Sequence, residues 1–212
     1  MKILFNSFLT ITLVTGLLPL TALAQIHITE VESSENGSNK ADWWELTNLG
    51  SSPVDISGWK MDDNSASFGS SVALSGITTI GPGESVAFFE VAGSTPLTVQ
   101  GFRDWWGLTT AVQVGTYTGS GVGLSSTADA VNLYDSVGDL MDSVSFGAAT
   151  KGVTFGWDPA TSTFGGLSQL GVNGAFAALQ DGDIGSPGSV PEPGTSGLLL
   201  LGTASLLLRR KN

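Results

Sequence analysis

The class of structure is indicated by residues 42–48, which read Asp42-Trp43-Trp44-Glu45-Leu46-Thr47-Asn48. In an extended chain, successive side chains point to opposite faces of a sheet. Trp44 and Leu46 therefore share one face, while Trp43, Glu45 and Thr47 share the other. Such a pattern is expected when one side of a sheet is buried and the other is solvated. We predict a strand of a half-buried sheet here.

Similar short segments lie on both sides of this one. Runs of β-branched and aromatic residues recur between clusters of Gly, Pro, Asn and Ser, and no long stretch keeps a helical period of 3.6 residues. The predicted strands are residues 26–32, 43–48, 54–59, 85–91, 130–135, 140–146 and 153–157. Seven or so short strands predict an all-β sandwich. Residues 115–126, which are rich in glycine, are expected to form a loop or hairpin.

One helix is expected between residues 94 and 107. Ser94 or Thr95 can cap it, Pro96 suits its first turn, and Gly107 can end it after Trp105 and Trp106. Its roughly apolar face consists of Leu97, Gly101, Trp105 and Leu108. We expect this helix to lie as a lid over one end of the sandwich.

The charge distribution excludes some classes of partner. The formal net charge is −11, but four basic residues face 19 acidic residues between positions 25 and 192, so the middle carries −15. A surface this acidic repels phosphate backbones, which argues against nucleic-acid binding. Cysteine is absent, so disulfides, thiol nucleophiles and Cys-based metal sites are excluded.

The N-terminal residues 1–24 have the features of a signal peptide. A basic Lys2 precedes an apolar run over residues 3–20, and Pro19 breaks the helix before Ala22 and Ala24. Small residues at these two positions suit signal peptidase, so we predict cleavage after Ala24 and export of the chain. The alternative is an uncleaved membrane helix, from which export also follows.

The C-terminal residues 189–212 contain a short apolar segment followed by a basic cluster. Residues 195–208 would span about 21 Å as a helix, less than a hydrocarbon core of about 30 Å. Arg209, Arg210 and Lys211 follow this segment and are expected to stay cytoplasmic. The helix would thus anchor the chain in the inner membrane with the domain outside.

In its order of elements, this tail resembles the PEP-CTERM sorting signal. Pro191, Glu192 and Pro193 precede the apolar helix and the basic cluster. The resemblance implies that an exosortase-type membrane protease reads this motif and delivers the protein to the cell surface or the extracellular space. A plain tail anchor after a proline-rich linker is the alternative.

The middle of the chain, residues 25–188, resembles the lamin-tail domain family. The match is carried by residues 28–31, 42–48, 54–63, 80–84, 102–108, 129–135 and 142–144, with a closing segment at 181–188. The resemblance implies an immunoglobulin-like β-sandwich with one short helix, between the N-terminal signal helix and the C-terminal hydrophobic helix. It also implies recognition or scaffolding, because no catalytic apparatus carries over from the family.

Residues suited to catalysis or metal binding are few. His27 is the only histidine and no G-x-S-x-G elbow accompanies it, so we expect a solvated or strand-edge residue rather than a hydrolase base. One imidazole also leaves too few ligands for a histidine zinc site. We therefore expect no cofactor, although the acidic loops at residues 62–64 and 181–183 leave calcium open.

The six tryptophans admit two interpretations. Either Trp43 and Trp106 expose a ring that binds sugars or proteins, or Trp44, Trp59 and Trp105 are core and the others cover sheet edges; we favour the second. We expect a non-enzymatic surface or extracellular-matrix protein, whose partners include extracellular polysaccharide or surface proteins. The alternatives are a carbohydrate-binding module and a weak carboxylate-dependent hydrolase.

Overall fold

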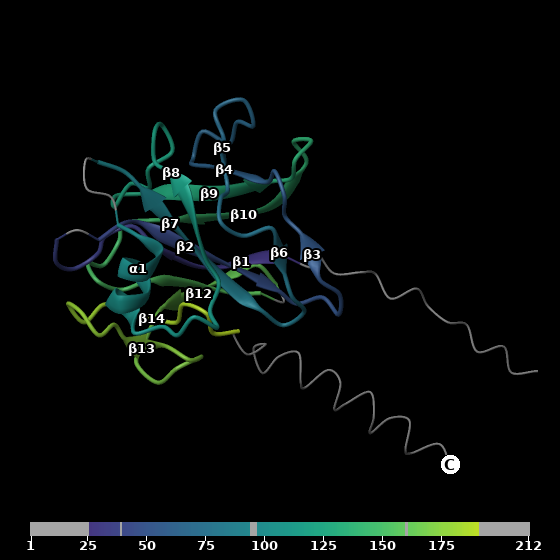
Figure 1. Cartoon of the computed structure of the whole chain (residues 1–212). Helices are drawn as coiled ribbons and strands as arrows, with labels where there is room; N and C mark the ends of the chain where they lie inside the picture. The colour runs from purple at the N-terminus through teal and green to yellow at the C-terminus, as the bar shows by residue number, and fades with distance from the viewer. Residues whose placement is uncertain (1–25, 39, 94–96, 160, 191–212) are drawn as a thin grey trace, which may run out of the picture.

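The structure is a computed structural model that describes residues 26–38, 40–93, 97–159 and 161–190. The predicted signal helix and the predicted C-terminal hydrophobic helix lie outside the described residues. The described part is mostly β structure with one short helix, as the sequence predicts (Figure 1).

Two sheets contain most of the strands. The larger sheet has the order β12 (Thr163–Leu167), β11 (Phe155–Asp158), β1 (Ile26–Glu32), β2 (Trp43–Asn48), β7 (Ser85–Val91), β8 (Val114–Thr118). Its pairs are antiparallel except for β7 and β8. The smaller sheet has the order β10 (Leu140–Phe146), β9 (Asp129–Tyr134), β4 (Lys60–Asp62), β5 (Val72–Ala73). Two short ladders pair β3 (Val54–Asp55) with β6 (Thr79–Ile80), and β13 (Phe176–Ala177) with β14 (Ile184–Gly185).

The main core contains apolar residues from both large sheets. Trp44 and Phe88 of the six-stranded sheet stack at 5.2 Å, and they belong to the same buried cluster as Leu133 and Val144 of the four-stranded sheet. Each such side chain contributes about 1.5–3 kcal/mol when fully buried. The two sheets are therefore held together by the alternate residues that each strand directs inward.

A second core covers the other face of the six-stranded sheet. Trp43 and Phe89 pack there against Phe102 and Trp106 of the helix α1 (Val99–Trp106). The prediction that β2 has one solvated face is therefore wrong, since all six of its residues are buried. In Figure 1, α1, β13 and β14 lie on the side of β1 and β2 opposite to β9 and β10.

The helix begins later than predicted and lies elsewhere. Its N-cap is Thr98, whose hydroxyl accepts a hydrogen bond from the Gly101 backbone N–H at 3.0 Å, rather than Ser94 or Thr95, which lie outside the described residues. Its predicted end is confirmed, because Gly107 takes a left-handed φ of 76°. The helix covers a sheet face, so the predicted position over a sandwich end is wrong.

Most of the predicted strands are confirmed, but two predicted strands and one predicted loop differ from the structure. The segment 54–59 is not one strand, because Asp55 accepts a hydrogen bond from the Ser57 N–H and Gly58 turns the chain at φ 76° before β4. The segment 153–157 begins as strand only at Phe155. The predicted loop 115–126 starts with most of β8.

Candidate ligand-binding pocket

Three glycines, Gly156, Gly165 and Gly166, lie on the outer face of the six-stranded sheet where β11 pairs with β12. Gly156 pairs with Gly166 and Trp157 pairs with Phe164, so Gly165 is the extra residue of a β-bulge. Phe155 and Trp157 point into the main core, which directs position 156 to the outer face. Without side chains at these positions, the sheet presents bare backbone there.

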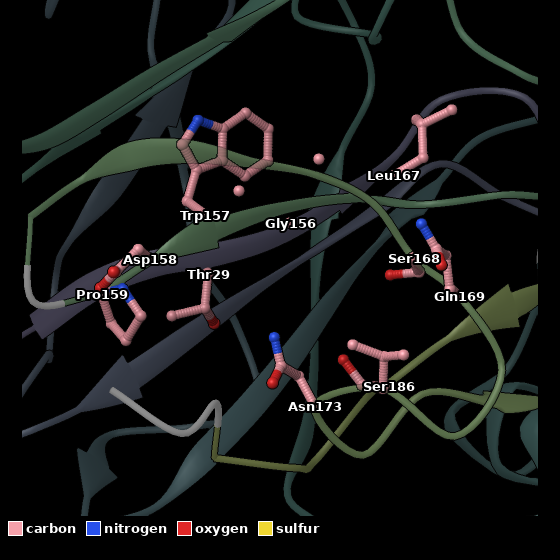
Figure 2. Close-up of a pocket in the computed structure, with 13 residues that line it drawn as sticks. Thr29, Gly156, Trp157, Asp158, Pro159, Leu167, Ser168, Gln169, Asn173 and Ser186 are labelled. Carbon is pink, nitrogen blue, oxygen red and sulfur yellow. The ribbon is translucent and has the colours of Figure 1, made fainter. Parts of the chain in front are cut away.

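A pocket of about 270 Å³ lies over these glycines. Its wall is closed by β1 and by the segments that follow β12 and β14. The lining residues are Thr29, Gly156, Trp157, Asp158, Pro159, Gly165, Gly166, Leu167, Ser168, Gln169, Val172, Asn173 and Ser186. In Figure 2 the ring of Trp157 lies across the β11 ribbon from the polar side chains, so the indole does not form the floor of the pocket.

Two amide side chains of the polar lining carry hydrogen-bonding groups that the described protein does not use. The carboxamides of Gln169 and Asn173 make no hydrogen bond to other described residues, and both side chains are exposed. Figure 2 shows the Asn173 amide pointing up into the ring of lining residues, with the Asp158 carboxylate at one end. None of the lining residues is Lys or Arg.

A buried carboxylate, that of Glu30, lies directly behind the pocket wall. It accepts hydrogen bonds from the Ser186 N–H at 2.8 Å, the Ser186 hydroxyl at 3.0 Å and the Thr154 hydroxyl. Burial raises the pKa of Glu30 to about 7, although these hydrogen bonds act in the opposite direction. Ser168, which also lines the pocket, has its hydroxyl 2.7 Å from that of Thr154.

Glu45 is a second buried carboxylate in this region. Thr29 donates to it at 2.7 Å, and the Gly188 N–H donates to it at 2.6 Å. Burial, and after it the charge of Glu30, raises the pKa of Glu45 well above its ordinary value. Neither carboxylate lines the pocket, and both are almost fully buried. Their oxygens are bonded to the protein's own N–H and O–H groups, so they support the wall rather than meet a substrate.

Another group of buried and half-buried acids lies near the loop that joins β1 to β2. Burial raises the pKa of Glu32 and of Asp42 to about 9, and it also raises that of Glu35, which shares a hydrogen bond with Asp42. The Tyr117 hydroxyl is buried nearby without a hydrogen-bond partner among the described residues. Within the described part of the chain, no three His, Cys, Asp or Glu side chains are arranged to hold a metal ion.

The two acidic loops considered for calcium use their buried carboxylates internally. Asp62 accepts hydrogen bonds from the Ser67 N–H at 2.7 Å and from the Ser65 hydroxyl at 2.6 Å. Asp183 accepts from the Asn36 N–H at 2.8 Å and the Trp105 indole N–H at 2.9 Å. These bonds organise turns and attach segments to one another, so neither loop supports the calcium hypothesis.

We expected His27 to be either solvated or at a strand edge, and the solvated alternative is wrong. It is 9% exposed on β1, and its Nδ1 lies 3.7 Å from the Asp142 carboxylate of β10 and 3.3 Å from the Ser162 hydroxyl. Asp142 also accepts a hydrogen bond from the Ile28 N–H at 2.7 Å. The histidine therefore lies beside a carboxylate that already ties the edge of β10 to β1.

The tryptophans are all core residues, each 6% exposed or less. Trp43 donates from its indole N–H to Glu32 at 2.6 Å, and Trp106 packs edge-on against Phe176. The interpretation that Trp43 or Trp106 offers an exposed platform is wrong. The preferred interpretation is right in naming Trp44, Trp59 and Trp105 as core, and it underestimates the burial of the other three.

The predicted targeting residues are not among those described. These are Ala22 and Ala24 of the cleavage site, Pro191, Glu192 and Pro193 of the sorting motif, and Arg209, Arg210 and Lys211 of the basic cluster. Among the residues that the structure does describe, no helix is sufficiently long and apolar to span a bilayer.

The features described so far define a class: a mostly β domain with two large sheets and a single short helix, among the described residues, that packs on one sheet face. The Lamin Tail Domain family model matches residues 19–148, more than half of the 212-residue chain, and the chain belongs to this family. A comparison with curated proteins gave no match.

The pocket lies almost wholly beyond the matched segment. Only Thr29 belongs to residues 19–148, while the other lining residues fall between 156 and 186. We did not predict this site, because its polar residues carry no motif. One signal was present: adjacent glycines, Gly165 and Gly166, inside a short β-rich segment indicate a bulge or a close backbone approach.

Proposed function

We propose that this protein is an exported, non-catalytic binding or scaffold protein of the cell surface or extracellular matrix. The observation that carries the proposal is the pocket, which offers unused hydrogen-bonding groups without a nucleophile and base placed to react. Recognition needs only such complementary groups, whereas hydrolysis needs reacting side chains in contact with the substrate.

The burial of the acids disfavours the hydrolase alternative. A carboxylate-dependent hydrolase needs an acid and a second carboxylate on either side of the bond that it breaks. Asp158 is the only carboxylate among the described lining residues, and Glu30 and Glu45 are enclosed behind the wall. The buried histidine beside Asp142 lies outside the pocket lining.

The proposed location of the protein outside the cell rests on the two ends of its sequence. Signal peptidase would cut after Ala24, and an exosortase-type membrane protease would read Pro191, Glu192 and Pro193. Until then, the predicted C-terminal helix and the cluster of Arg209, Arg210 and Lys211 would hold the chain in the inner membrane. The acidic surface again argues against a nucleic-acid partner.

The two-sheet arrangement also supports an immunoglobulin-like β-sandwich of the lamin-tail kind. A four-stranded and a six-stranded sheet share one apolar core, and β4 lies between β5 and β9 rather than beside β3. Sandwiches of this type commonly serve in adhesion and recognition outside the cell, which agrees with the proposed location.

Cell fractionation of the native host tests the proposal, with antibodies raised against the purified protein. We expect surface or extracellular protein whose N-terminus is Gln25. Glu192→Ala should trap the protein in the inner membrane, while Asp139→Asn, a change of an exposed acid, should leave its location unchanged. Unaltered sorting of Glu192→Ala would contradict the sorting signal, and an intact chain in the cytoplasm would contradict export.

A further inference from the structure

The floor of the pocket determines what shape of ligand can approach. Gly156, Gly165 and Gly166 leave the sheet without side chains there, so a ligand can approach the main chain closely. A ring with substituents around its edge fits a floor of this kind, with one face of the ring on the glycines and its edge toward the wall.

The side chains around the floor determine the chemistry. Gln169 and Asn173 each offer an N–H₂ donor and a carbonyl acceptor, and Asp158 offers acceptor oxygens. A ligand hydroxyl both donates and accepts, so each carboxamide can satisfy neighbouring hydroxyl groups on one ring. The ring of lining residues in Figure 2 thus suits a ligand with hydroxyl groups along several edges.

Charge narrows the ligand class further. The lining contains a carboxylate and neither Lys nor Arg, and the domain as a whole is strongly acidic. Phosphates, sulfates and uronic acids would lack a cationic partner and would face repulsion from Asp158. The lining therefore disfavours an anionic ligand, and the hydroxyl-matching carboxamides are satisfied by a neutral one.

Size gives the last constraint. The volume of about 270 Å³ is slightly below that of most small-molecule sites, which measure about 300–1,000 Å³. We propose that this pocket binds one sugar ring of a neutral polysaccharide or oligosaccharide, through Gln169, Asn173 and Asp158 over the glycine floor. This proposal rests on the binding role proposed above and names its ligand class.

Calorimetric titration of the purified full-length chain tests this site. The probes are methyl glycosides of glucose, galactose, mannose and N-acetylglucosamine, with methyl glucuronide as the acidic comparison. We expect millimolar or tighter binding of at least one neutral glycoside, and binding of the glucuronide at least tenfold weaker. Failure of every neutral glycoside to bind, or equal binding of the glucuronide, overturns the proposal.

Gly156→Val is the sharpest variant, because it fills the floor. A Cβ at this position would lie 3.7 Å from the Gly166 carbonyl oxygen, an ordinary contact, and the backbone there has no left-handed φ. We expect at least a tenfold loss of affinity. Gly147→Ala is the matched control, since a Cβ there meets nothing within 4 Å and Gly147 does not line the pocket. Thermal unfolding of each variant verifies that it is folded.

Gln169→Ala keeps the proposal testable if Gly156→Val fails to fold. Its amide makes no hydrogen bond within the described protein, so its removal should weaken glycoside binding at least threefold without lowering stability. Unchanged affinity in Gln169→Ala, or in folded Gly156→Val, overturns the site. Fractionation of Gly156→Val separates the two proposals, because a protein that no longer binds sugar should still reach the surface.

Discussion

The Asp183 carboxylate accepts a hydrogen bond from the indole N–H of Trp105 at 2.9 Å, across 78 residues of sequence. The same carboxylate accepts from the Asn36 N–H in the loop after β1. Asp183 lies beyond the segment that the family model matches, whereas Trp105 and Asn36 lie within it. The last described segment is therefore attached to the family-matched part of the fold.

Replacing Asp183 should destabilise the fold strongly. Asp183→Ala removes a buried acceptor from two donors, and each unsatisfied donor costs about 1–3 kcal/mol. We expect urea unfolding to show a loss of about 2–4 kcal/mol. Asp181→Asn is the control, because Asp181 is exposed and asparagine tolerates its φ of 65°. Equal stability of the two variants would show that the attachment is unimportant.

Truncation should show that the family-matched segment does not fold on its own. Residues 26–190 should unfold cooperatively, whereas residues 26–148 lack β11 to β14 and leave Glu30 and Glu45 without Ser186 and Gly188. Exposed apolar surface and an uncovered sheet face should then prevent cooperative unfolding. Circular dichroism during a urea titration distinguishes the two fragments, and a cooperative transition in the shorter one would contradict the prediction.

Stability should fall as the pH rises. Burial raises the pKa of Glu30 to about 7, and those of Glu32 and Asp42 to about 9, from ordinary values of 4.5 for Glu and 3.8 for Asp. Between these values the folded state binds more protons than the unfolded state, so the free energy of unfolding decreases as pH increases. The contribution is fully present below about pH 4 and is lost through about pH 9.

Urea unfolding at pH 5, 7 and 9 measures this dependence. We expect the midpoint to decrease stepwise over the three values, and Glu32→Gln to reduce the decrease between pH 7 and 9. A midpoint that is constant or rises with pH would show that these carboxyls are ionised in the fold.

The two aromatic positions Trp43 and Phe164 should differ sharply in their effect on stability. Trp43 is fully buried against α1, so Trp43→Ala should destabilise the fold by about 3–5 kcal/mol. Phe164 on β12 is 56% exposed, and Phe164→Ala should cost less than about 1 kcal/mol. Thermal unfolding compares the two variants, and a small effect of Trp43→Ala would argue against the second core.

The strands were predictable where local pattern and tertiary environment agree. β1, β2, β7 and β10 match their predicted limits because each contains β-branched or aromatic residues and is followed by turn-forming residues. The half-solvated face of β2 was predicted wrongly, because alternation shows which residues share a face and not what covers it. Trp43 and Glu45 are covered by α1 and by residues near Gly188, and both contacts are distant in sequence.

The pocket could not be predicted from the sequence either, because its residues are also distant from one another along the chain. Its floor comes from a register shift at Gly165, and its wall joins Thr29 of β1 to Asn173 and Ser186. Polar residues so far apart form no spacing that could be recognised. His27 was misjudged in the same way, because its neighbour Asp142 lies on a strand of the other sheet.

The bulge at Gly165 also affects how copies of this protein meet one another. β12 is an edge of the six-stranded sheet, and an edge with a regular row of N–H and C=O groups invites another chain to continue the sheet. The extra residue interrupts that row and bends the strand. At high density on a surface, the bulge would thus disfavour pairing of β12 with a strand of a neighbouring molecule, and so disfavour aggregation.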